Sequence, residues 1–263
     1  MLKPAPRCED QQTIRQGRVA VPIRGARHPH IPAKAVESRG AGLFPVKHLI
    51  NRETFAKGAP NHGRPWKNGK EAILPNSSGP APAISARFRL KAATAAAHDR
   101  LDGWMSRYDL TCRADYGAFL QAQAGAFMGV EDALDEADAE IHLPDWHERR
   151  RTMALRSDLN LMGLTFPEPA QVTPFRGEAE VLGAIYVLEG SRLGGAVLIR
   201  SVPDGLPKSF LSSGNPAAWR ALASVLDERL SSPDRFDSAA RAACSVFAVF
   251  ENAARAYPGA DRK

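Results

Sequence analysis

The sequence predicts an all-α protein. Helix-forming residues recur at helical intervals, Pro and Gly mark the breaks between such stretches, and no strand-like alternating run of any length occurs. The chain has 263 residues, of which 44% are hydrophobic and 24% are charged. This composition excludes disorder throughout and is sufficient for a sizeable hydrophobic core.

Charge and proline divide the chain into two unequal parts. Residues 1–84 contain 14 Lys and Arg against 5 Asp and Glu, a net charge of +9, together with 11 of the 20 prolines. Residues 85–263 carry a net charge of −3. We therefore expect a basic, Pro- and Gly-rich extension over residues 1–85, either disordered or the product of a misplaced start, then one helical domain over residues 86–257 and a tail over residues 258–263.

This division also limits the partners. The basic balance belongs to the extension, so we expect no nucleic-acid partner, although an extension acting as a nucleic-acid-binding arm is an alternative. No run of about 18 consecutive apolar residues occurs, and residues 1–30 lack the apolar core of a secretory signal. We therefore expect a cytoplasmic protein with no membrane partner.

Six helices are expected in the domain. The first, over residues 88–102, is rich in Ala and contains no Pro. The second, over residues 114–140, has apolar residues at helical spacing. A third follows the break at Leu143-Pro144, with Asp145 as its cap, and continues through Leu155.

The remaining three helices have clear boundary signals. Residues 177–200 form an apolar helix that contains three closely spaced glycines. Residues 216–230 follow Asn215, a favoured capping residue, and begin with Pro216, which suits the first turn. The sixth helix is expected over residues 238–257.

A basic run lies between the second and fourth of these helices. Arg149, Arg150, Arg151 and Arg156 alternate with acidic residues in the surrounding sequence. Such mixed charge is typical of a solvated helix face with surface salt bridges, and this is our interpretation of the run.

His98 is the first candidate for chemistry. Asp102 lies at i+4 on the same helix face, where its carboxylate can accept one ring N–H and leave the other nitrogen free as a ligand. Lys91 lies two turns before His98 on that face. This set suits an anionic metal macrocycle, but a solvated histidine with an acidic i+4 partner is a common surface feature and is the alternative.

The glycines of the fourth helix are the second candidate. Gly190, Gly194 and Gly195 lie within six residues, although each glycine in a helix interior costs about 1 kcal/mol relative to alanine. Gly190 and Gly194 share a face, so their bare backbone allows a flat group to approach closely. The alternatives are a neighbouring helix packed on this face and a helix that ends near Gly194.

Taken together, these motifs resemble a known family. Lys-Ala-Ala-Thr-x-x-x-His-x-x-Leu-Asp over residues 91–102 is followed by Leu-Glu-Gly-Ser-x-Leu-Gly-Gly over residues 188–195, with Pro144-Asp-Trp-His-Glu-Arg-Arg-Arg151 and Leu161-Met-Gly-Leu164 between them. This pattern resembles the haem oxygenases, and most closely the bacterial biliverdin-producing branch associated with bacteriophytochromes. The resemblance covers residues 86–257 and implies a haem oxygenase-like helical fold.

The resemblance implies roles for individual residues. His98 would be the proximal ligand of the haem iron, with Asp102 as its acidic partner. Lys91 would pair with a haem propionate, and Arg220 falls near a position that supplies a second cation. The distal, catalytic face would comprise Gly190, Ser191 and Gly194, and Ser191 departs from the mammalian-type enzymes, which have an aspartate there.

The resemblance also implies an activity. Haem would serve as both cofactor and substrate, and O2 with external electrons would convert it to biliverdin, carbon monoxide and ferrous iron. The sequence contains no flavin, nicotinamide or iron–sulfur motif, so a reductase or a ferredoxin-type donor is an implied partner, and a bacteriophytochrome is an implied acceptor of biliverdin. A non-catalytic haem carrier or sensor is the alternative, because Ser191 cannot carry the charge of an aspartate.

Overall fold

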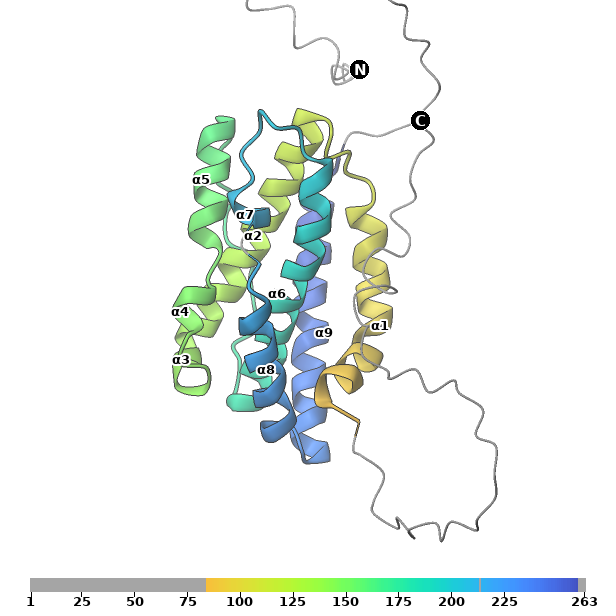
Figure 1. Ribbon diagram of the computed structural model, residues 1–263, viewed down its shortest axis with the longest axis vertical. Coiled ribbons are helices and arrows are strands. Elements are labelled where there is room, and N and C mark those ends of the chain that lie inside the picture. Colours follow the sequence, from red (N-terminus) through yellow and green to blue (C-terminus); the bar gives the residue numbers. More distant parts are fainter. Residues whose placement is uncertain (1–83, 213, 260–263) are drawn as a thin grey trace, which may run out of the picture. The chain divides into compact units, whose positions relative to one another are not determined.

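The structure is a computed structural model that describes residues 84–212 and 214–259. The basic extension expected over residues 1–85 lies almost entirely outside the described residues. Within the described residues every regular element is a helix, as the sequence predicted (Figure 1). In chain order these are α1 (Ala86–Met105), α2 (Arg113–Glu136), α3 (Ala139–His142), α4 (Trp146–Arg149), α5 (Thr152–Met162), α6 (Glu178–Leu198), the 3-10 helix η1 (Ile199–Ser201), α7 (Ser209–Ser212), α8 (Pro216–Arg229) and α9 (Pro233–Ala256).

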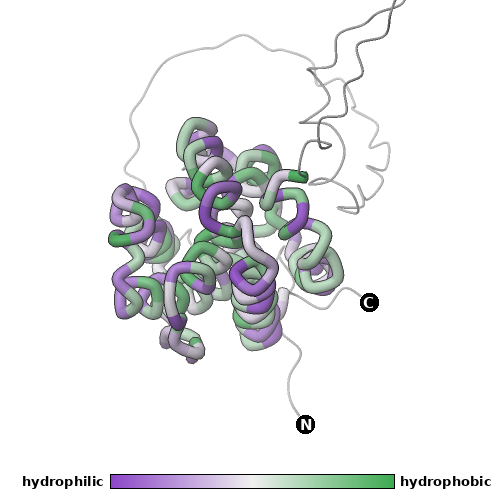
Figure 2. Tube along the Cα trace, turned by 90° about the horizontal axis from the view of Figure 1, so that it is seen from below, coloured by the Kyte–Doolittle hydropathy of each residue, from purple (hydrophilic) through white to green (hydrophobic). Residues whose placement is uncertain are grey.

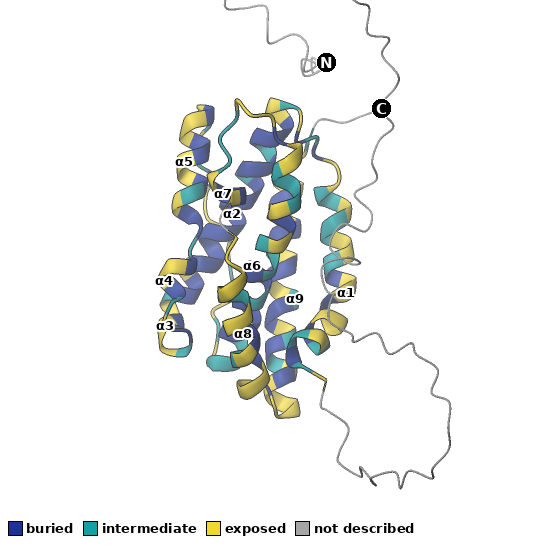
Figure 3. Cartoon of the chain, in the orientation of Figure 1, coloured by how far each residue is buried: buried dark blue, intermediate teal, exposed yellow. Residues whose placement is uncertain are grey.

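The long helices α2, α6 and α9 form the centre of the bundle. Helix α9 packs against α1, α2 and α6, while α5 and α7 cover α2 and α6. In Figure 3 α2 and α6 are largely buried, whereas α1 and α8 each keep an exposed face. Viewed end-on, most helices carry both hydrophobic and hydrophilic residues (Figure 2). Burial of the apolar faces between the helices therefore provides the main stabilisation.

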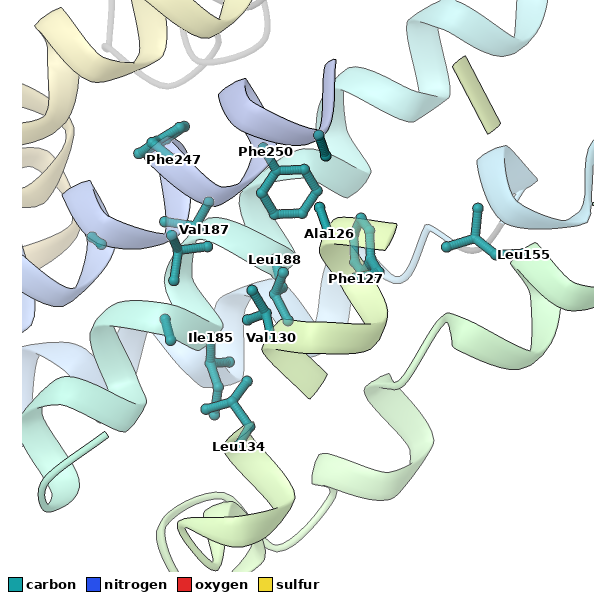
Figure 4. Close-up of a cluster of buried hydrophobic side chains, with 14 of the residues drawn as sticks. Ala126, Phe127, Val130, Leu134, Leu155, Ile185, Val187, Leu188, Phe247 and Phe250 are labelled. Atoms are coloured by element: carbon teal, nitrogen blue, oxygen red, sulfur yellow. The ribbon is translucent and has the colours of Figure 1, made fainter. Parts of the chain in front are cut away.

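The core consists of aromatic and branched aliphatic side chains from these central helices. Phe127 of α2 packs edge-on against Phe250 of α9, with ring centroids 5.1 Å apart. Figure 4 shows this pair among other buried side chains of α2, α5, α6 and α9. Those labelled there are Ala126, Phe127, Val130, Leu134, Leu155, Ile185, Val187, Leu188, Phe247 and Phe250.

Two glycines allow close backbone contact in this core. A Cβ atom added to Gly183 of α6 would overlap the carbonyl oxygen of Ala239 in α9. A Cβ atom added to Gly129 of α2 would overlap the carbonyl oxygen of Ala170 in the loop before α6. These two positions require glycine for packing.

The caps explain where the last two helices begin. The Asn215 side chain accepts hydrogen bonds from the backbone N–H groups of Ala217 and Ala218, at 3.0 and 3.2 Å, which confirms the predicted start of α8. Helix α9 begins five residues earlier than expected. Ser232 caps it through the backbone N–H of Arg235, and Pro233 occupies the first turn.

Two predicted helices are each divided in the structure. The second breaks into α2 and α3 at Asp138, whose φ of 50° is left-handed. The third breaks into α4 and α5, because the buried carboxylate of Glu131 binds the backbone N–H groups of Arg151 and Thr152 and so caps α5 from another helix. Asp145 precedes α4 but makes no cap hydrogen bond; its carboxylate binds Arg149 instead.

Helix α6 is unusually apolar. The stretch Glu178–Ser201 is long and apolar enough to cross a membrane by length and composition, although Glu189 and Arg192 interrupt it and it contains no run of about 18 consecutive apolar residues. Half of its most apolar window is buried inside the fold. Core helices meet the same criteria of length and composition, and α6 has the contacts of a core helix.

Candidate active site

The His98–Asp102 pair on α1 forms as the sequence predicted. The Nδ1 atom of His98 lies 3.1 Å from Oδ2 of Asp102. The hydrogen bond to Asp102 is the main cause that raises the pKa of His98 above 6.5; burial and the charge of Lys91 oppose it. The imidazole is held in place by one nitrogen, and Nε2 remains available to a ligand.

The surroundings of His98 are apolar on one side. Its ring meets that of Phe247 on α9 edge-on, with centroids 5.7 Å apart and planes at 70°. The His98 side chain is 30% exposed and that of Asp102 is 46% exposed. His98 is therefore neither a fully solvated surface residue nor a core residue; it lies at the edge of a face that a ligand can cover.

Helices α1 and α6 run in the same direction along α9. On α1, Arg89 lies over the ring of Phe236 and Arg100 reaches Glu251, so the numbering of the two helices increases together. On α6, Glu178 pairs with Arg235, and Gly183 lies against Ala239. Figure 1 shows the same parallel course.

A contact between α1 and α6 sets their register. Burial raises the pKa of Tyr186 on α6, and its phenol lies close enough to the hydroxyl of Thr94 on α1 for that group to oppose the rise. His98 lies one turn after Thr94, and Gly190 lies one turn after Tyr186. The two parallel helices thus bring His98 and Gly190 to the same level.

Gly190 faces open space. A Cβ atom added there would meet no other heavy atom within 4 Å, so helix packing does not account for this glycine. The helix also continues to Leu198, so the alternative that it ends near Gly194 was wrong. Leu193, on the same face, is 40% exposed although it belongs to the most apolar helix. A bare glycine beside an exposed leucine is suited to contact with a flat apolar group.

The two cations predicted to bind propionates, Lys91 and Arg220, differ in their position relative to His98. Lys91 is exposed on α1, close enough to lower the pKa of His98. Arg220 is exposed on α8, and its Nε donates to the Pro216 carbonyl of its own helix, at 3.3 Å. The neighbouring Trp219 ring lies 6.0 Å from that of Tyr186, so α8 approaches the same end of α6. The structure brings Lys91 near His98 but shows no such proximity for Arg220.

Trp219 adds an unpartnered donor at this end. Its indole Nε1 is buried and has no hydrogen-bond partner among the described residues. Trp146, by contrast, donates its Nε1 hydrogen to Asp135, at 2.7 Å. A buried donor without an acceptor is costly, and a carboxylate arriving near Tyr186 is a chemically suitable partner.

The interpretation of the basic run Arg149–Arg151 and Arg156 as a solvated helix face is wrong for two of its four residues. Arg149 and Arg151 are only 5% and 3% exposed, so they are not part of a solvated face; of the run, Arg150 and Arg156 keep greater exposure. Arg149 binds the buried carboxylate of Glu189 on α6, at 3.0 Å. Its partner lies 40 residues away in the sequence, which is why local charge patterning gave the wrong result.

Arg151 reaches the distal candidate Ser191. Its Nη1 donates to Ser191 Oγ, at 2.8 Å, and its Nη2 donates to the carbonyl of Phe210, at 3.0 Å. The guanidinium also lies over the rings of Phe210 and Phe127. Burial lowers the pKa of Arg151 to about 9. Nothing in the local sequence around Arg151 indicates this contact.

A cavity of about 570 Å³ lies elsewhere, on the outer side of α2 and α5. It includes none of the predicted site residues. The residues that line it are Met128, Asp132, His147, Arg150, Thr152, Met153, Arg156 and Pro169.

The residues on α1 and α6 fit haem. A single imidazole backed by a carboxylate suits one axial position of an iron macrocycle. The open space at Gly190 and the exposed Leu193 provide an apolar face at the same level. Lys91 and the unpartnered indole of Trp219 offer donors for carboxylates.

Comparisons with known proteins identify relatives of this chain. No family model matches the chain. A haem oxygenase of Xanthomonas campestris pv. campestris is 34% identical over 152 residues, which span 54% of this chain and 92% of that protein. A haem oxygenase of Neisseria meningitidis, solved in NO- and CO-bound forms, superposes with a TM-score of 0.59 at 25% identity, over 68% of this chain and 96% of that one. The chain therefore belongs to the haem oxygenase family.

Proposed function

We propose that the protein binds haem between α1 and α6 and cleaves it oxidatively to biliverdin, carbon monoxide and ferrous iron. The observation that carries this proposal is the level placement of His98 and Gly190 on two parallel helices, with a hydrogen-bonded imidazole on one side and open space on the other. Membership of the haem oxygenase family supports the reaction class.

His98 is proposed as the iron ligand. Asp102 holds Nδ1, so Nε2 is the nitrogen that binds the metal, and the carboxylate increases the electron donation of the imidazole. Lys91 and Arg220, with the Tyr186 phenol and the Trp219 indole, bind the propionates. Among these, Lys91 and Tyr186 lie on the two helices that form the site, whereas Arg220 would have to turn away from Pro216.

We propose that Gly190 and Ser191 form the distal face, with Gly194 buried one turn after Gly190. Haem, when bound, supplies the iron that activates O2 and the macrocycle that is oxidised. The bare backbone at Gly190 leaves room beside the ring, and Leu193 limits that room on one side. Ser191 provides a hydroxyl at the edge of this face, where it can hold a water molecule for proton delivery.

External electrons are required, and we propose a reductase or a ferredoxin-type protein as their source. A cytoplasmic location suits such a donor. We further propose that the protein belongs to the biliverdin-supplying branch, with a bacteriophytochrome as the acceptor, on the basis of the sequence resemblance.

Haemin titration tests the proposal. The full chain is mixed with haemin, and the visible spectrum is recorded before and after a reductant is supplied in air. An intense bound-haem band that gives way to biliverdin absorption supports the enzyme. A persistent band supports the non-catalytic carrier or sensor instead, and the absence of a bound band contradicts both functions.

A further inference from the structure

We propose that Arg151 is a positioning residue that fixes Ser191 as a hydrogen-bond acceptor on the distal face of α6. This inference rests on the proposed function, because it concerns what the site presents to bound haem. It assigns a role to a buried guanidinium for which neither the sequence nor the family comparison provides one.

Ser191 uses its hydroxyl hydrogen and one of its two lone pairs in hydrogen bonds within the protein. Its hydroxyl donates to the carbonyl of Leu188, one turn back on α6, at 2.7 Å. Its oxygen accepts from Arg151 Nη1, at 2.8 Å. A hydroxyl has one hydrogen and two lone pairs, so a single lone pair remains for another partner. Ser191 is partly exposed, and that lone pair can only accept.

This arrangement addresses the departure from the mammalian-type pattern. An ionised aspartate accepts hydrogen bonds and cannot donate them. A free serine can do either, since its hydroxyl rotates to suit its partner. Held between Leu188 and Arg151, Ser191 has the acceptor character of a carboxylate without its charge, and it orients a water molecule by accepting one of its hydrogens.

Arg151 is held firmly enough for this task. Its second terminal nitrogen binds the Phe210 carbonyl, and its Cζ atom lies 3.9 Å from the Phe210 ring centroid and 4.8 Å from that of Phe127. Its backbone N–H is fixed by Glu131, at 2.6 Å. Three elements, α2, α7 and the start of α5, thus determine where the guanidinium points, and it points to Ser191.

The neighbouring Arg149 shows that this contact is selective. Arg149 is similarly buried but binds the carboxylates of Glu189 and Asp145, as expected for a structural ion pair. The Arg151 side chain has two acceptors, both neutral oxygens, and its Nε has no hydrogen-bond partner among the described residues. A buried cation bound to a serine hydroxyl is a costly choice for stability alone.

A double-mutant cycle on the haem-loaded full chain tests the proposal. The variants are Arg151→Met, Ser191→Ala and the double variant, with Arg151→Lys as the conservative replacement. The readout is the pH at which the visible spectrum of the ferric haem complex is half-way between its acid and its alkaline form. This midpoint responds to hydrogen bonding at the distal face. Turnover to biliverdin is measured alongside.

We expect Arg151→Met to shift the midpoint by about half a pH unit or more, since a hydrogen bond of about 1 kcal/mol corresponds to roughly 0.7 unit. In the Ser191→Ala background the shift falls to less than half of that, and Arg151→Lys recovers most of the wild-type midpoint. If Arg151→Met does not fold, Arg151→Gln takes its place in the cycle.

Equal shifts in both backgrounds, or no shift in a variant that still binds haem, would overturn the role of Arg151 and leave the proposed function intact. A wild-type protein that shows no bound-haem band would instead overturn the proposed function. The two failures are therefore distinguishable.

Discussion

His98 and Asp102 form a hydrogen-bonded pair in which Nδ1 and Oδ2 are 3.1 Å apart, and this pair fixes which imidazole nitrogen faces the site. The pair is local, with a spacing of one helical turn. Its orientation toward α6, by contrast, depends on contacts between α1, α6 and α9 that are distant in the sequence.

Replacing Asp102 with Asn should lower the pKa of His98 in the haem-free protein, because the hydrogen bond to Asp102 is the main cause that raises it. NMR titration of the His98 side chain measures this change. Asp99→Asn is the matched control, since Asp99 raises the pKa only through its charge and should have a smaller effect. Equal pKa shifts for the two variants would show that the hydrogen bond to Asp102 is not the main cause of the raised pKa of His98.

The same pair predicts how stability varies with pH. The pKa of His98 is raised in the folded state, so its protonated form contributes stability in full below about pH 6.5. That contribution is lost as the pH rises through the folded-state pKa. Urea denaturation at several pH values should show this loss in the wild type and little of it in Asp102→Asn. A slope of opposite sign would contradict the assignment.

Two glycines of α6 should have different roles, Gly183 in packing and Gly190 in haem binding. Gly183→Ala should destabilise the fold by about 2 kcal/mol or more, because its Cβ atom would overlap the Ala239 carbonyl. Gly190→Ala should leave stability unchanged or raise it by about 1 kcal/mol, since its surroundings are open and alanine favours the helix. Urea denaturation measures both, and haemin titration should show weaker binding for Gly190→Ala. Marked destabilisation by Gly190→Ala would indicate a packing role instead.

The buried pair Arg149–Glu189 should be structural. Glu189→Gln removes the buried carboxylate shared by Arg149 and Arg192, leaving Arg149 only its pair with the more exposed Asp145, and should cost about 3 kcal/mol or more of unfolding free energy. The exposed pair His147–Glu140 is the control, and Glu140→Gln should change stability by less than about 1 kcal/mol. Chemical denaturation of both variants measures the difference, and similar small effects would show that the α4–α6 ion pair does not stabilise the fold.

Lys91 should act on the carboxylates of haem. Lys91→Met should weaken haemin binding by about 3- to 10-fold and leave binding of haemin dimethyl ester unchanged, because the ester carries no propionate charge. Arg156→Met is a suitable control, since Arg156 on α5 lies over the ring of Phe166, in the loop after that helix, away from α1. Equal losses for haemin and its ester would mean that Lys91 supports packing and not charge recognition.

Features that depend on neighbouring residues were predictable from the sequence. The Asn215 cap, the course of α6 and the His98–Asp102 pair all follow from spacing along one helix. Features that depend on distant residues were not. The break before α5 comes from Glu131 on α2, and the burial of Arg149 comes from Glu189, 40 residues later. In the site, likewise, the contacts Thr94–Tyr186 and Arg151–Ser191 could not be predicted, because each joins residues of separate elements.

The most direct experiment tests whether His98 is the ligand of the haem iron. Haemin is added to the wild type, to His98→Ala and to His147→Ala, whose histidine lies on the exposed surface of α4 beside Glu140. We predict that His98→Ala alone changes the visible spectrum of the ferric complex, and that added imidazole restores the wild-type spectrum. An unchanged spectrum in His98→Ala would contradict the account.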